Sequence, residues 1–469
     1  MRKKYLFIAL GGFIIFLLIT VNYYLNKDYQ IDYIPKNNIT ATNSDNNDYY
    51  ETLLPVAFYE YDKRMVYWGY INLDGEVAIS LNYHDALNFD ENYLAVVKVI
   101  KNKHDYYGLI NTKNEKVLET KYQKIEYLGE GLYYYVEGSK AYLGKYETNN
   151  REFSVLKEVA YDKVGSFYEG FAYVVSDNKL GFIDIGGVEV IPLNYEYKKD
   201  FNFNFYQNYA FIYKNGKFGV IDKENNLIKA PMYDDVLNDY ELEFDYTTEY
   251  YEGYELVPVK LNNKWGYINR SGEVVIQPEY VEAYPFVNNE LARVKLQTDA
   301  YNFIDKNNTL LSSSNFSSAQ DFYDGYAVTS LGDYKVGLID TSGNVVVDHN
   351  YDYVGYPRYG KILTIINSKS VYYDLNNLND KSLTISINYY LGDNMTDCEV
   401  MFATDDKRSY VILDLLGKRI YPKITAREYG QINYHGEKYI ALVAYEEASN
   451  LEYFTYINEA GELLWKVYK

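Results

Sequence analysis

The feature that most restricts the fold of this chain is a short stretch of sequence that recurs along it. Its clearest copy is KWGYINRSGEVVIQPEY, at positions 264–280, whose first glycine is Gly266. Asn or Asp stands three places after this glycine, Gly or Asn six places after it, and Tyr fourteen places after it. We call these positions +3, +6 and +14, and the position before the glycine −1. The aligned glycines are Gly69, Gly108, Gly181, Gly219, Gly266 and Gly337; position +3 holds Asn72, Asn111, Asp184, Asp222, Asn269 and Asp340; position +6 holds Gly75, Asn114, Gly187, Asn225, Gly272 and Gly343; position +14 holds Tyr83, Tyr122, Tyr195, Tyr233, Tyr280 and Tyr351.

The spacing predicts a β-hairpin in each copy. Asn or Asp at the first corner of a type I turn accepts a local backbone hydrogen bond, and Gly or Asn three positions later tolerates the left-handed conformation that closes a bulged hairpin. The flanking segments, such as residues 265–269 and 273–277, are short runs rich in β-branched and aromatic residues, as strands prefer. Another extended segment precedes the hairpin, as in residues 168–175, so each unit is predicted to contain three strands.

Weaker copies lie between and after the clear ones, for example at residues 301–305, 410–414 and 455–458. Residues 53–469 are therefore predicted to form an all-β repeat array of roughly eleven three-stranded units of ~38 residues. One such unit cannot bury its own apolar face, so neighbours must stack. Propeller-like blades, which we favour, and an open β-solenoid both fit. Because eleven exceeds the usual four to eight blades, we expect two rings or an open spiral.

The motif resembles the bacterial WG-repeat family, whose units pair a Trp-Gly dipeptide with a following Ile-Asp or Ile-Asn and a hairpin bounded by glycine. The resemblance covers nearly the whole chain after the first fifty residues, and its clearest dipeptides are Trp68-Gly69 and Trp265-Gly266. In the other copies position −1 holds Tyr107, Leu180, Phe218 or Val336. This position therefore requires bulk and not an indole. The resemblance implies a β-repeat protein, often located at the cell surface, and brings no catalytic mechanism with it.

The N-terminal segment predicts a membrane anchor. Three basic residues lie in a predicted cytoplasmic tail, residues 1–4, before an uncharged and mostly apolar run at residues 5–25. A helix needs ~20 such residues to cross a bilayer. The basic residues favour a cytoplasmic N-terminus, hence a single-pass protein of the cell membrane with an extracytoplasmic array. A cleaved signal peptide is the alternative, although no small-x-small site follows the run. Residues 26–52, rich in Asn and Asp, are expected to form a flexible tether.

The net charge and the residue composition limit the classes of partner that the chain can bind. The formal net charge of −20 disfavours binding to nucleic acid and to anionic lipid. The chain has 60 tyrosines, and we interpret most of them as packing residues whose hydroxyl reaches water or a carbonyl, with sugar-stacking platforms as the alternative. The single cysteine, Cys398, excludes an intramolecular disulfide, so strand pairing and core burial must hold the fold. The sequence does not indicate an oligomeric state.

One stretch interrupts the regular spacing of the repeat. The interval from Gly219 to Gly266 is longer than the preceding interval, from Gly181 to Gly219. An insertion in a repeat array maps to a loop, and such loops commonly carry binding. We treat this segment as a candidate binding loop with the residue types to coordinate Ca²⁺ or stack against a glycan; the alternative is a solvated acidic loop that protects an edge strand. Its acidic and aromatic residues are Asp239, Glu241, Glu243, Asp245, Tyr246, Glu249, Tyr250 and Tyr251.

The sequence carries no recognisable catalytic signature. Its four histidines, at positions 84, 104, 349 and 435, form no zinc-ligand spacing, and nucleophile-elbow, P-loop and dinucleotide motifs are missing. A pair of glycosidase carboxylates stays open, because their separation depends on the fold. We therefore expect a non-catalytic binding or scaffold module for a protein or glycan partner, with no catalytic, cofactor or metal residue assigned. A cell-envelope hydrolase and a purely structural spacer are the alternatives.

Overall fold

The structure, a computed structural model, describes most of the predicted repeat array. The described residues are 52–60, 65–73, 76–237, 255–287, 290–332, 334–357, 360–367, 369–375, 400–403, 410–414, 419–420, 424–434, 437–446, 451–458 and 460–464. The predicted tail, membrane helix and nearly all of the tether, residues 1–51, lie outside these ranges, as does the candidate binding loop at residues 239–251. Within the ranges, no helix is long and apolar enough to cross a membrane.

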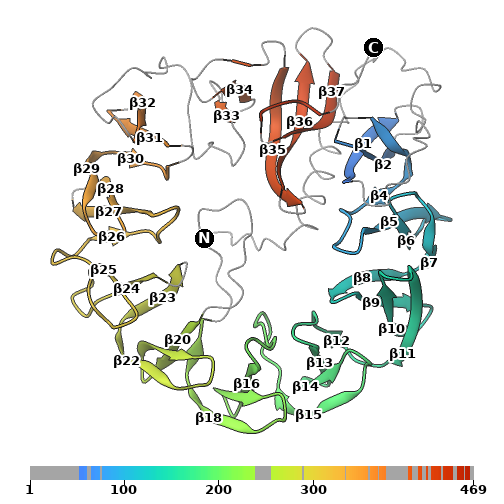
Figure 1. The fold of residues 1–469 in the computed structure, drawn as a ribbon, viewed down its shortest axis with the longest axis horizontal. Coiled ribbons are helices and arrows are strands. Elements are labelled where there is room, and N and C mark those ends of the chain that lie inside the picture. The colour runs from blue at the N-terminus through green and yellow to red at the C-terminus, as the bar shows by residue number, and fades with distance from the viewer. Residues whose placement is uncertain are drawn as a thin grey trace.

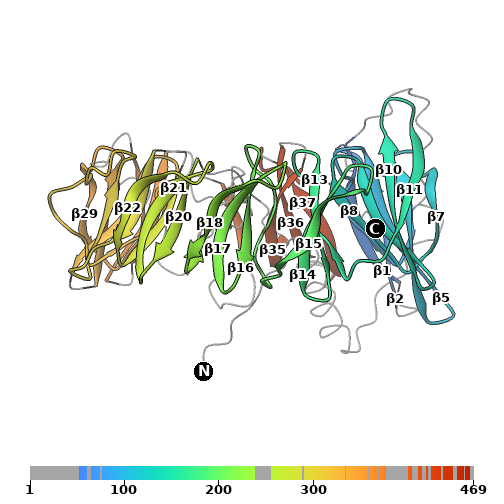
Figure 2. The ribbon, with the colours of Figure 1, turned by 90° about the horizontal axis from the view of Figure 1, so that it is seen from below.

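The described residues form antiparallel sheets and no helix, arranged as ten blades around a common axis (Figure 1). In the blades before the last one the strands follow one another outward from the axis, and Figure 2 shows that they run roughly along it. The all-β prediction is confirmed. The prediction of three strands per unit misses a short inner strand that several blades contain. These inner strands are β4, β12, β19, β26 and β30, with two residues each.

The first three blades contain β1 (Leu54–Glu60), β2 (Met65–Ile71) and β3 (Val77–Tyr83); β4 (Asp85–Ala86), β5 (Leu94–Lys101), β6 (His104–Asn111) and β7 (Lys116–Tyr122); and β8 (Lys124–Gly129), β9 (Leu132–Glu137), β10 (Lys140–Glu147) and β11 (Glu152–Val159). The next four contain β12 (Lys163–Val164), β13 (Phe171–Ser176), β14 (Lys179–Asp184) and β15 (Glu189–Glu196); β16 (Tyr209–Lys214), β17 (Lys217–Asp222) and β18 (Leu227–Tyr233); β19 (Asp235–Val236), β20 (Leu256–Leu261), β21 (Lys264–Asn269) and β22 (Val274–Tyr280); and β23 (Glu282–Val287), β24 (Leu291–Lys295) and β25 (Tyr301–Ile304). The last three contain β26 (Ser318–Ala319), β27 (Tyr326–Gly332), β28 (Lys335–Asp340) and β29 (Val345–Tyr351); β30 (Tyr353–Val354), β31 (Lys361–Ile366) and β32 (Lys369–Asp374); and β33 (Val400–Ala403), β34 (Tyr410–Asp414), β35 (Ile424–Tyr434), β36 (Glu437–Glu446) and β37 (Leu451–Ile457).

The last blade contains two of the predicted units. The weak copy at residues 410–414 is β34, and the copy at residues 455–458 begins in β37. Strand β35 joins them, because it pairs with β34 at one end and with β36 along its length. Its register shifts between Ala426 and Glu428, which divides it into the outer strand of one unit and the inner strand of the next. Roughly eleven sequence units therefore appear as ten sheets in the described part of the chain.

The ring closes on itself, which corrects our expectation of two rings or an open spiral. Tyr439, Ala441 and Tyr456 of the last blade share a hydrophobic core with Leu54 and Val56 of the first. The Tyr456 hydroxyl also donates a hydrogen bond of 2.6 Å to the Pro55 carbonyl oxygen. Neighbouring blades pack through side chains, so the angle between them can be small enough for this many narrow blades to complete one turn.

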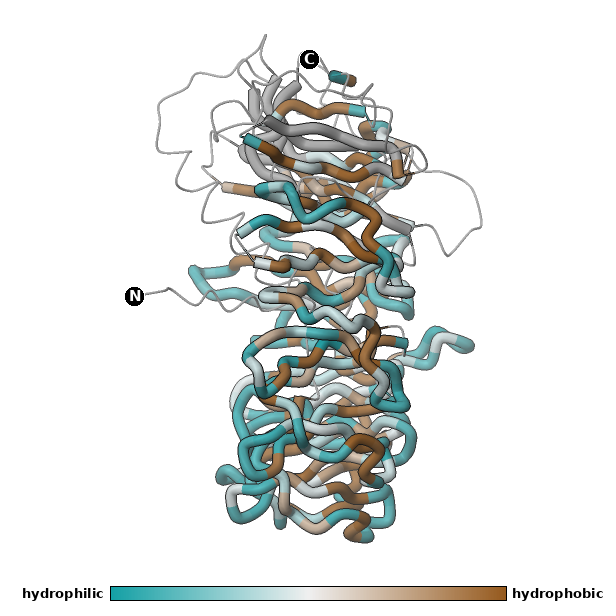
Figure 3. The backbone as a smooth tube through the Cα atoms, turned by 90° about the vertical axis from the view of Figure 1, so that its left-hand side faces the viewer, coloured by the Kyte–Doolittle hydropathy of each residue, from teal (hydrophilic) through white to brown (hydrophobic). Residues whose placement is uncertain are grey.

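The hydrophobic core lies between neighbouring blades rather than within any one of them. One cluster, for instance, joins Phe182 of the fourth blade to Phe205 and Ile212 of the fifth. In Figure 3 the hydrophobic residues gather along the strands, and hydrophilic residues gather in the turns. A phenylalanine recurs beside the inner strands and is almost completely buried; these residues are Phe89, Phe167, Phe205, Phe286 and Phe322.

Candidate functional site

Positions +3 and +6 form the predicted turn. In the sixth blade, the Gly272 amide donates to the Asn269 carbonyl oxygen at 2.9 Å, and the Glu273 amide donates to the Asn269 side-chain oxygen at 2.9 Å. Gly272 has a φ of +77°, in the left-handed region that favours glycine. Position +6 has the same backbone in the other described units: φ is 63° at Asn114, 73° at Gly187, 64° at Asn225 and 80° at Gly343. Gly75 lies outside the described residues.

The first glycine of the repeat is required by a close approach of backbone. A Cβ atom added to Gly266 would lie 2.5 Å from the Ile276 carbonyl oxygen, closer than real Cβ atoms approach. The register between β21 and β22 shifts at this point, from Trp265 opposite Tyr280 to Tyr267 opposite Ile276. Four other units show the same crowding by a backbone carbonyl oxygen, at Gly69, Gly181, Gly219 and Gly337. At Gly108 the nearest atom is instead the Thr120 methyl carbon at 2.6 Å, with the Leu118 carbonyl oxygen at 3.0 Å.

The bulky side chain at position −1 lies directly opposite the +14 tyrosine of its own unit. This pairing joins the second and third strands of each hairpin and explains why indole is not needed, because any large side chain can cover the tyrosine. The six pairs are Trp68 with Tyr83, Tyr107 with Tyr122, Leu180 with Tyr195, Phe218 with Tyr233, Trp265 with Tyr280, and Val336 with Tyr351.

The +14 tyrosine also bonds to the next unit when that unit has Asn at +6. Tyr83 donates its hydroxyl to the Asn114 side-chain oxygen at 2.6 Å, and Tyr195 donates to Asn225 at 2.7 Å. The same bond joins Tyr280 to Asn308 of the weak seventh unit.

Tyr233 shows what is lost when the next unit has glycine at +6. Its side chain is 1% exposed, and its hydroxyl oxygen has no hydrogen-bond partner among the described residues. The next unit places Gly272 at position +6, so the amide oxygen found in other units is missing.

Tyrosines at +1, the position after the aligned glycine, make a second bond between blades. Tyr70 donates its hydroxyl to the Leu87 carbonyl oxygen at 2.8 Å, and Tyr267 donates to the Tyr284 carbonyl oxygen at 2.8 Å. Tyr456 occupies the same place in the last unit, so its bond across the ring closure repeats a contact used inside the ring.

The residue after the +14 tyrosine fixes the inner hairpin of the following blade. Asp234 accepts a hydrogen bond of 2.8 Å from the Asn262 amide, and Asp352 accepts one of 2.7 Å from the Asn367 amide. His84 occupies this position in the first blade, where its Nδ1 accepts a bond of 3.2 Å from the Ile100 amide. These acidic residues and this histidine therefore have a structural role.

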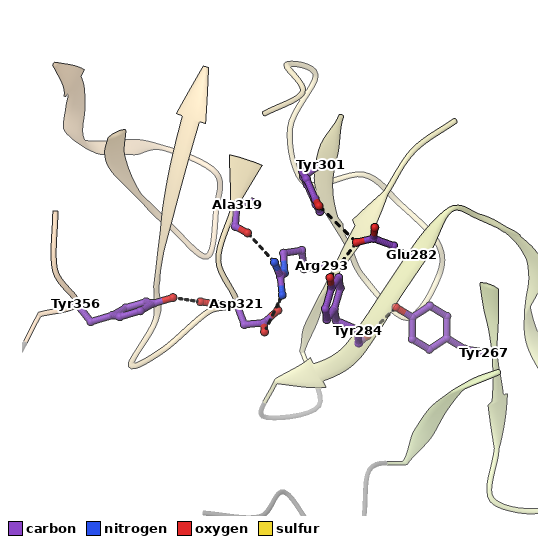
Figure 4. Close-up of polar contacts among 8 residues, drawn as sticks. All are labelled: Tyr267, Glu282, Tyr284, Arg293, Tyr301, Ala319, Asp321 and Tyr356. Carbon is purple, nitrogen blue, oxygen red and sulfur yellow. Dashed lines mark hydrogen bonds and ion pairs between the residues drawn. The ribbon is translucent and has the colours of Figure 1, made fainter. Parts of the chain in front are cut away.

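A dense polar cluster among the described residues lies around Arg293, where the seventh blade meets the eighth (Figure 4). Arg293 in β24 is buried, and its Nε donates to Asp321 Oδ1 at 2.9 Å. Its Nη2 donates to Asp321 Oδ2 at 3.2 Å, and its Nη1 donates to the Ala319 carbonyl oxygen at 2.7 Å. The carboxylate of Asp321 is equally buried, so this is a charge pair held out of water.

Aromatic residues extend this cluster over four blades. The Tyr284 ring lies 3.7 Å from the Arg293 guanidinium, close enough for a cation–π contact. Burial raises the pKa of Tyr284, whose hydroxyl donates to Glu282 at 2.9 Å. Tyr267 of the sixth blade bonds to the Tyr284 carbonyl, and Tyr356 of the ninth bonds to the Asp321 carbonyl (Figure 4). Because Arg293 already donates to Asp321 and Ala319, the geometry makes it a junction residue and not a ligand-binding one.

Sequence reasoning missed Arg293, although the repeat contains a signal for it. Arg293 lies opposite Phe303, which occupies position +1, and the equivalent residues of other blades are uncharged. They are Val96, Tyr173, Phe211, Pro258, Val328 and Leu363. Aligning the first strands of the units as well as the hairpins would have marked Arg293 as the exception.

A second polar cluster joins the second and third blades. Tyr133 of β9 donates its hydroxyl to Asp90, and Tyr127 of β8 donates to the neighbouring Glu91. Burial raises the pKa of Asp90 to about 6, although its hydrogen bonds act in the opposite direction. Burial also raises the pKa of Tyr133, so this hydroxyl stays a donor. We therefore expect the contact between these two blades to depend on pH.

The candidate binding loop is not placed, because Asp239 to Tyr251 lie outside the described residues. Its proposed link to Ca²⁺ therefore stays a prediction. In the ranges that are described, no group of three or more His, Cys, Asp or Glu side chains is arranged to hold a metal ion. His349 lies beside β27, where its Nε2 is 2.8 Å from the Thr329 hydroxyl.

Comparisons with known proteins identify the repeat. A family profile described as "WG containing repeat" matches residues 68–103, 107–140, 150–179, 240–265, 265–297, 303–334 and 337–369. These seven matches include the units of Gly69, Gly108, Gly266 and Gly337 but leave residues 180–239 and those after 369 unmatched. The family resemblance predicted from the motif is confirmed at these seven positions. No curated protein matches the chain.

Two solved structures are similar at low identity. The crystal structure of Sqt1 from Saccharomyces cerevisiae is 6% identical, with 78% of this chain and 91% of that chain covered and a TM-score of 0.26. PorZ, a bacterial surface component of the type-IX secretion system of Porphyromonas gingivalis, is 10% identical, with 84% and 62% covered and a TM-score of 0.22. Scores this low carry no argument about fold or function.

Proposed function

Since the chain belongs to the WG-repeat family, we propose that it is a membrane-tethered, extracytoplasmic ring that binds a protein or glycan partner without catalysis. The observation that carries this proposal is how the repeated polar residues are used. The Asn and Asp side chains at +3 close turns, and the +14 tyrosines and the residues after them bond to the next unit. The side chains at the repeated positions therefore hold the ring together. The residues that differ between units remain available to contact a partner.

The sequence supports the membrane part of the proposal. Arg2, Lys3 and Lys4 precede the apolar run at residues 5–25, and residues 26–52 are long enough to separate the ring from the bilayer. Topology can be measured directly. Protease added to intact cells should degrade the ring and spare a tag placed before Met1. Protection of the ring together with loss of the tag would reverse the proposed orientation.

Binding is tested with the purified array, residues 53–469, against isolated envelope polysaccharides and surface proteins. We expect retention of one class above the background given by the same array after heat unfolding. The acidic ring should retain neither DNA nor vesicles of anionic lipid, because its formal charge repels both. Retention of no glycan and no surface protein would leave the structural spacer as the better interpretation. Release of sugars from a retained glycan would instead support the hydrolase alternative.

A further inference from the structure

The outermost strand of the third blade, β11, differs from those of the next three blades. The outer strands β15, β18 and β22 contain Pro192, Pro231 and Pro278. Proline has no backbone N–H to donate, and natural sheets use it to prevent an edge strand from pairing with another chain. Strand β11 is also the outermost strand of its sheet, and it contains no proline. Its edge therefore lacks this protection.

Strand β11 is also longer in its pairing and more exposed. It pairs with β10 at seven positions with one shift of register, whereas β22 pairs with β21 at three positions with two shifts. Tyr142 explains the difference, because it stands two residues after the start of β10, where β21 has the crowded Gly266. All residues of β11 except Phe153 and Val159 are exposed. Figure 2 shows the β10–β11 hairpin extending beyond the turns of the neighbouring blades.

The one shift of register decides which side chains of β11 share a face. Phe153 packs against the cluster that joins the second and third blades, whereas the Lys157 ammonium donates to the Gly187 carbonyl oxygen of the fourth blade at 3.0 Å. Residues four apart in a regular strand point to the same face, but the shift opposite Leu143 lies between these two. Leu156, which precedes Lys157, therefore lies on the same face as Phe153.

The sequence of this strand is complementary to itself in the antiparallel direction. Two copies can be aligned so that opposite charges meet and the two large apolar side chains meet. The pairs are Arg151 with Glu158, Glu152 with Lys157, and Phe153 with Leu156. Opposite residues in an antiparallel pair must point to the same face, and the shift of register allows this for Phe153 with Leu156 and for Glu152 with Lys157. Sliding one copy by one residue would place Glu152 opposite Glu158, so the charges select the alignment.

We propose that two copies of this chain associate through β11, with the two edge strands paired antiparallel about a twofold axis. The outward backbone groups of each β11 bond to the other copy, which joins a sheet of one ring to a sheet of the other. The axis makes each side-chain pair twice, as in other twofold interfaces. The charges match those of the same strand in reverse order, which favours a second copy over another extended segment. The association does not depend on the ligand that the ring binds, so the two proposals can fail separately.

The first test is a disulfide between two copies of the full chain in its source cells, with Cys398→Ser to remove the natural thiol. Ser154→Cys places a thiol near the middle of each β11, beside the twofold axis and within reach of the other. The matched control is Asn194→Cys, an exposed site on β15, the outer strand of the fourth blade. Under mild oxidation we expect a disulfide-linked dimer from position 154 and only monomer from position 194.

The second test reverses charges in the chain that has Ser154→Cys. Lys157→Glu places like charges opposite each other at two symmetry-related positions, so it should lower the dimer yield roughly tenfold. Adding Glu152→Lys exchanges the two charges and should restore the yield. These two residues lie far apart along one strand, so the restoration cannot arise within a single chain.

Several results would overturn the proposal. One is the absence of a dimer from position 154 in a chain that keeps its unfolding midpoint, and another is an equal dimer yield from positions 154 and 194. An adduct of position 154 with a different protein would mean that the edge strand has another occupant. A dimer that Lys157→Glu does not weaken, or that Glu152→Lys does not restore, would exclude the proposed pairing. None of these results would affect retention of a glycan or surface protein by the ring, which tests the binding function.

Discussion

Gly272 offers a test of the contacts that connect neighbouring blades. It occupies position +6 of the sixth unit, with a φ of +77°, and the preceding unit presents the buried, unpartnered hydroxyl of Tyr233. In Gly272→Asn, the new side chain tolerates this backbone and supplies the oxygen that Asn225 supplies to Tyr195 at 2.7 Å. Gly272→Val has neither property, because a β-branched side chain is strained at positive φ.

The expected free energies follow from these two differences. Valine should cost about 1 to 3 kcal/mol through backbone strain. Asparagine carries less strain and gains a buried hydrogen bond of about 0.5 to 1.5 kcal/mol, so its net effect should be near zero. Either added Cβ atom meets the Cβ of Lys229 at 3.2 Å, so this crowding is common to both variants and cancels in the comparison. We therefore expect the asparagine variant to be more stable than the valine variant by about 2 kcal/mol.

Urea unfolding followed by tryptophan fluorescence measures the difference, because Trp265 lies in the same blade. Adding Tyr233→Phe completes a double-mutant cycle. It should be nearly neutral in the natural chain, where the hydroxyl is unpartnered, and should cost about 1 kcal/mol beside Gly272→Asn. Equal midpoints for Gly272→Asn and Gly272→Val would refute the turn assignment. A coupling energy of zero would refute the bond between Tyr233 and the new asparagine.

Three further predictions concern other contacts between blades. Arg293→Met should cost about 3 to 5 kcal/mol because it leaves the Asp321 carboxylate buried without its partner, and adding Asp321→Leu should recover most of the loss in thermal unfolding. Burial raises the pKa of Asp90 to about 6, so the stability gained by its protonation is fully present below about pH 4 and is lost as pH rises through 6. The free energy of unfolding should fall by about 3 kcal/mol over this range. Urea midpoints should show this fall in the natural chain and should not show it in Asp90→Asn. Tyr456→Phe should cost about 1 kcal/mol and speed amide exchange in the first strand, beside Pro55, more than in the fifth blade; uniform exchange would contradict the closure contact.

The local geometry of the units could be predicted from the sequence, and their contacts with one another could not. Positions +3 and +6 lie in one turn, so their spacing alone indicates the hydrogen bonds that Asn269 accepts. The reason for the first glycine depends on the approach of another strand, which Gly266 does not disclose by itself. The closure depends on a contact between Pro55 and Tyr456, 401 residues apart, and no periodicity encodes it.

The candidate site illustrates the same division. The acidic insertion at residues 239–251 was conspicuous in sequence but lies outside the described residues, so its role stays a prediction. Arg293 was inconspicuous because it occupies an ordinary strand position, and its significance depends on the uncharged residues at equivalent places in other blades.

The closure between the last and first blades gives this repeat array a property that a linear one lacks. In a linear array each terminal repeat has a neighbour on one side only, so unfolding can begin there, and special capping repeats are needed to protect the two ends. A circle of blades has no terminal repeat. Weakening the bond from Tyr456 to Pro55 would therefore do more than remove one contact, because it would create two ends at once. The same loss of free energy, divided equally among all the boundaries between blades, would create no end. The position of a defect in this ring therefore matters as much as its energetic cost.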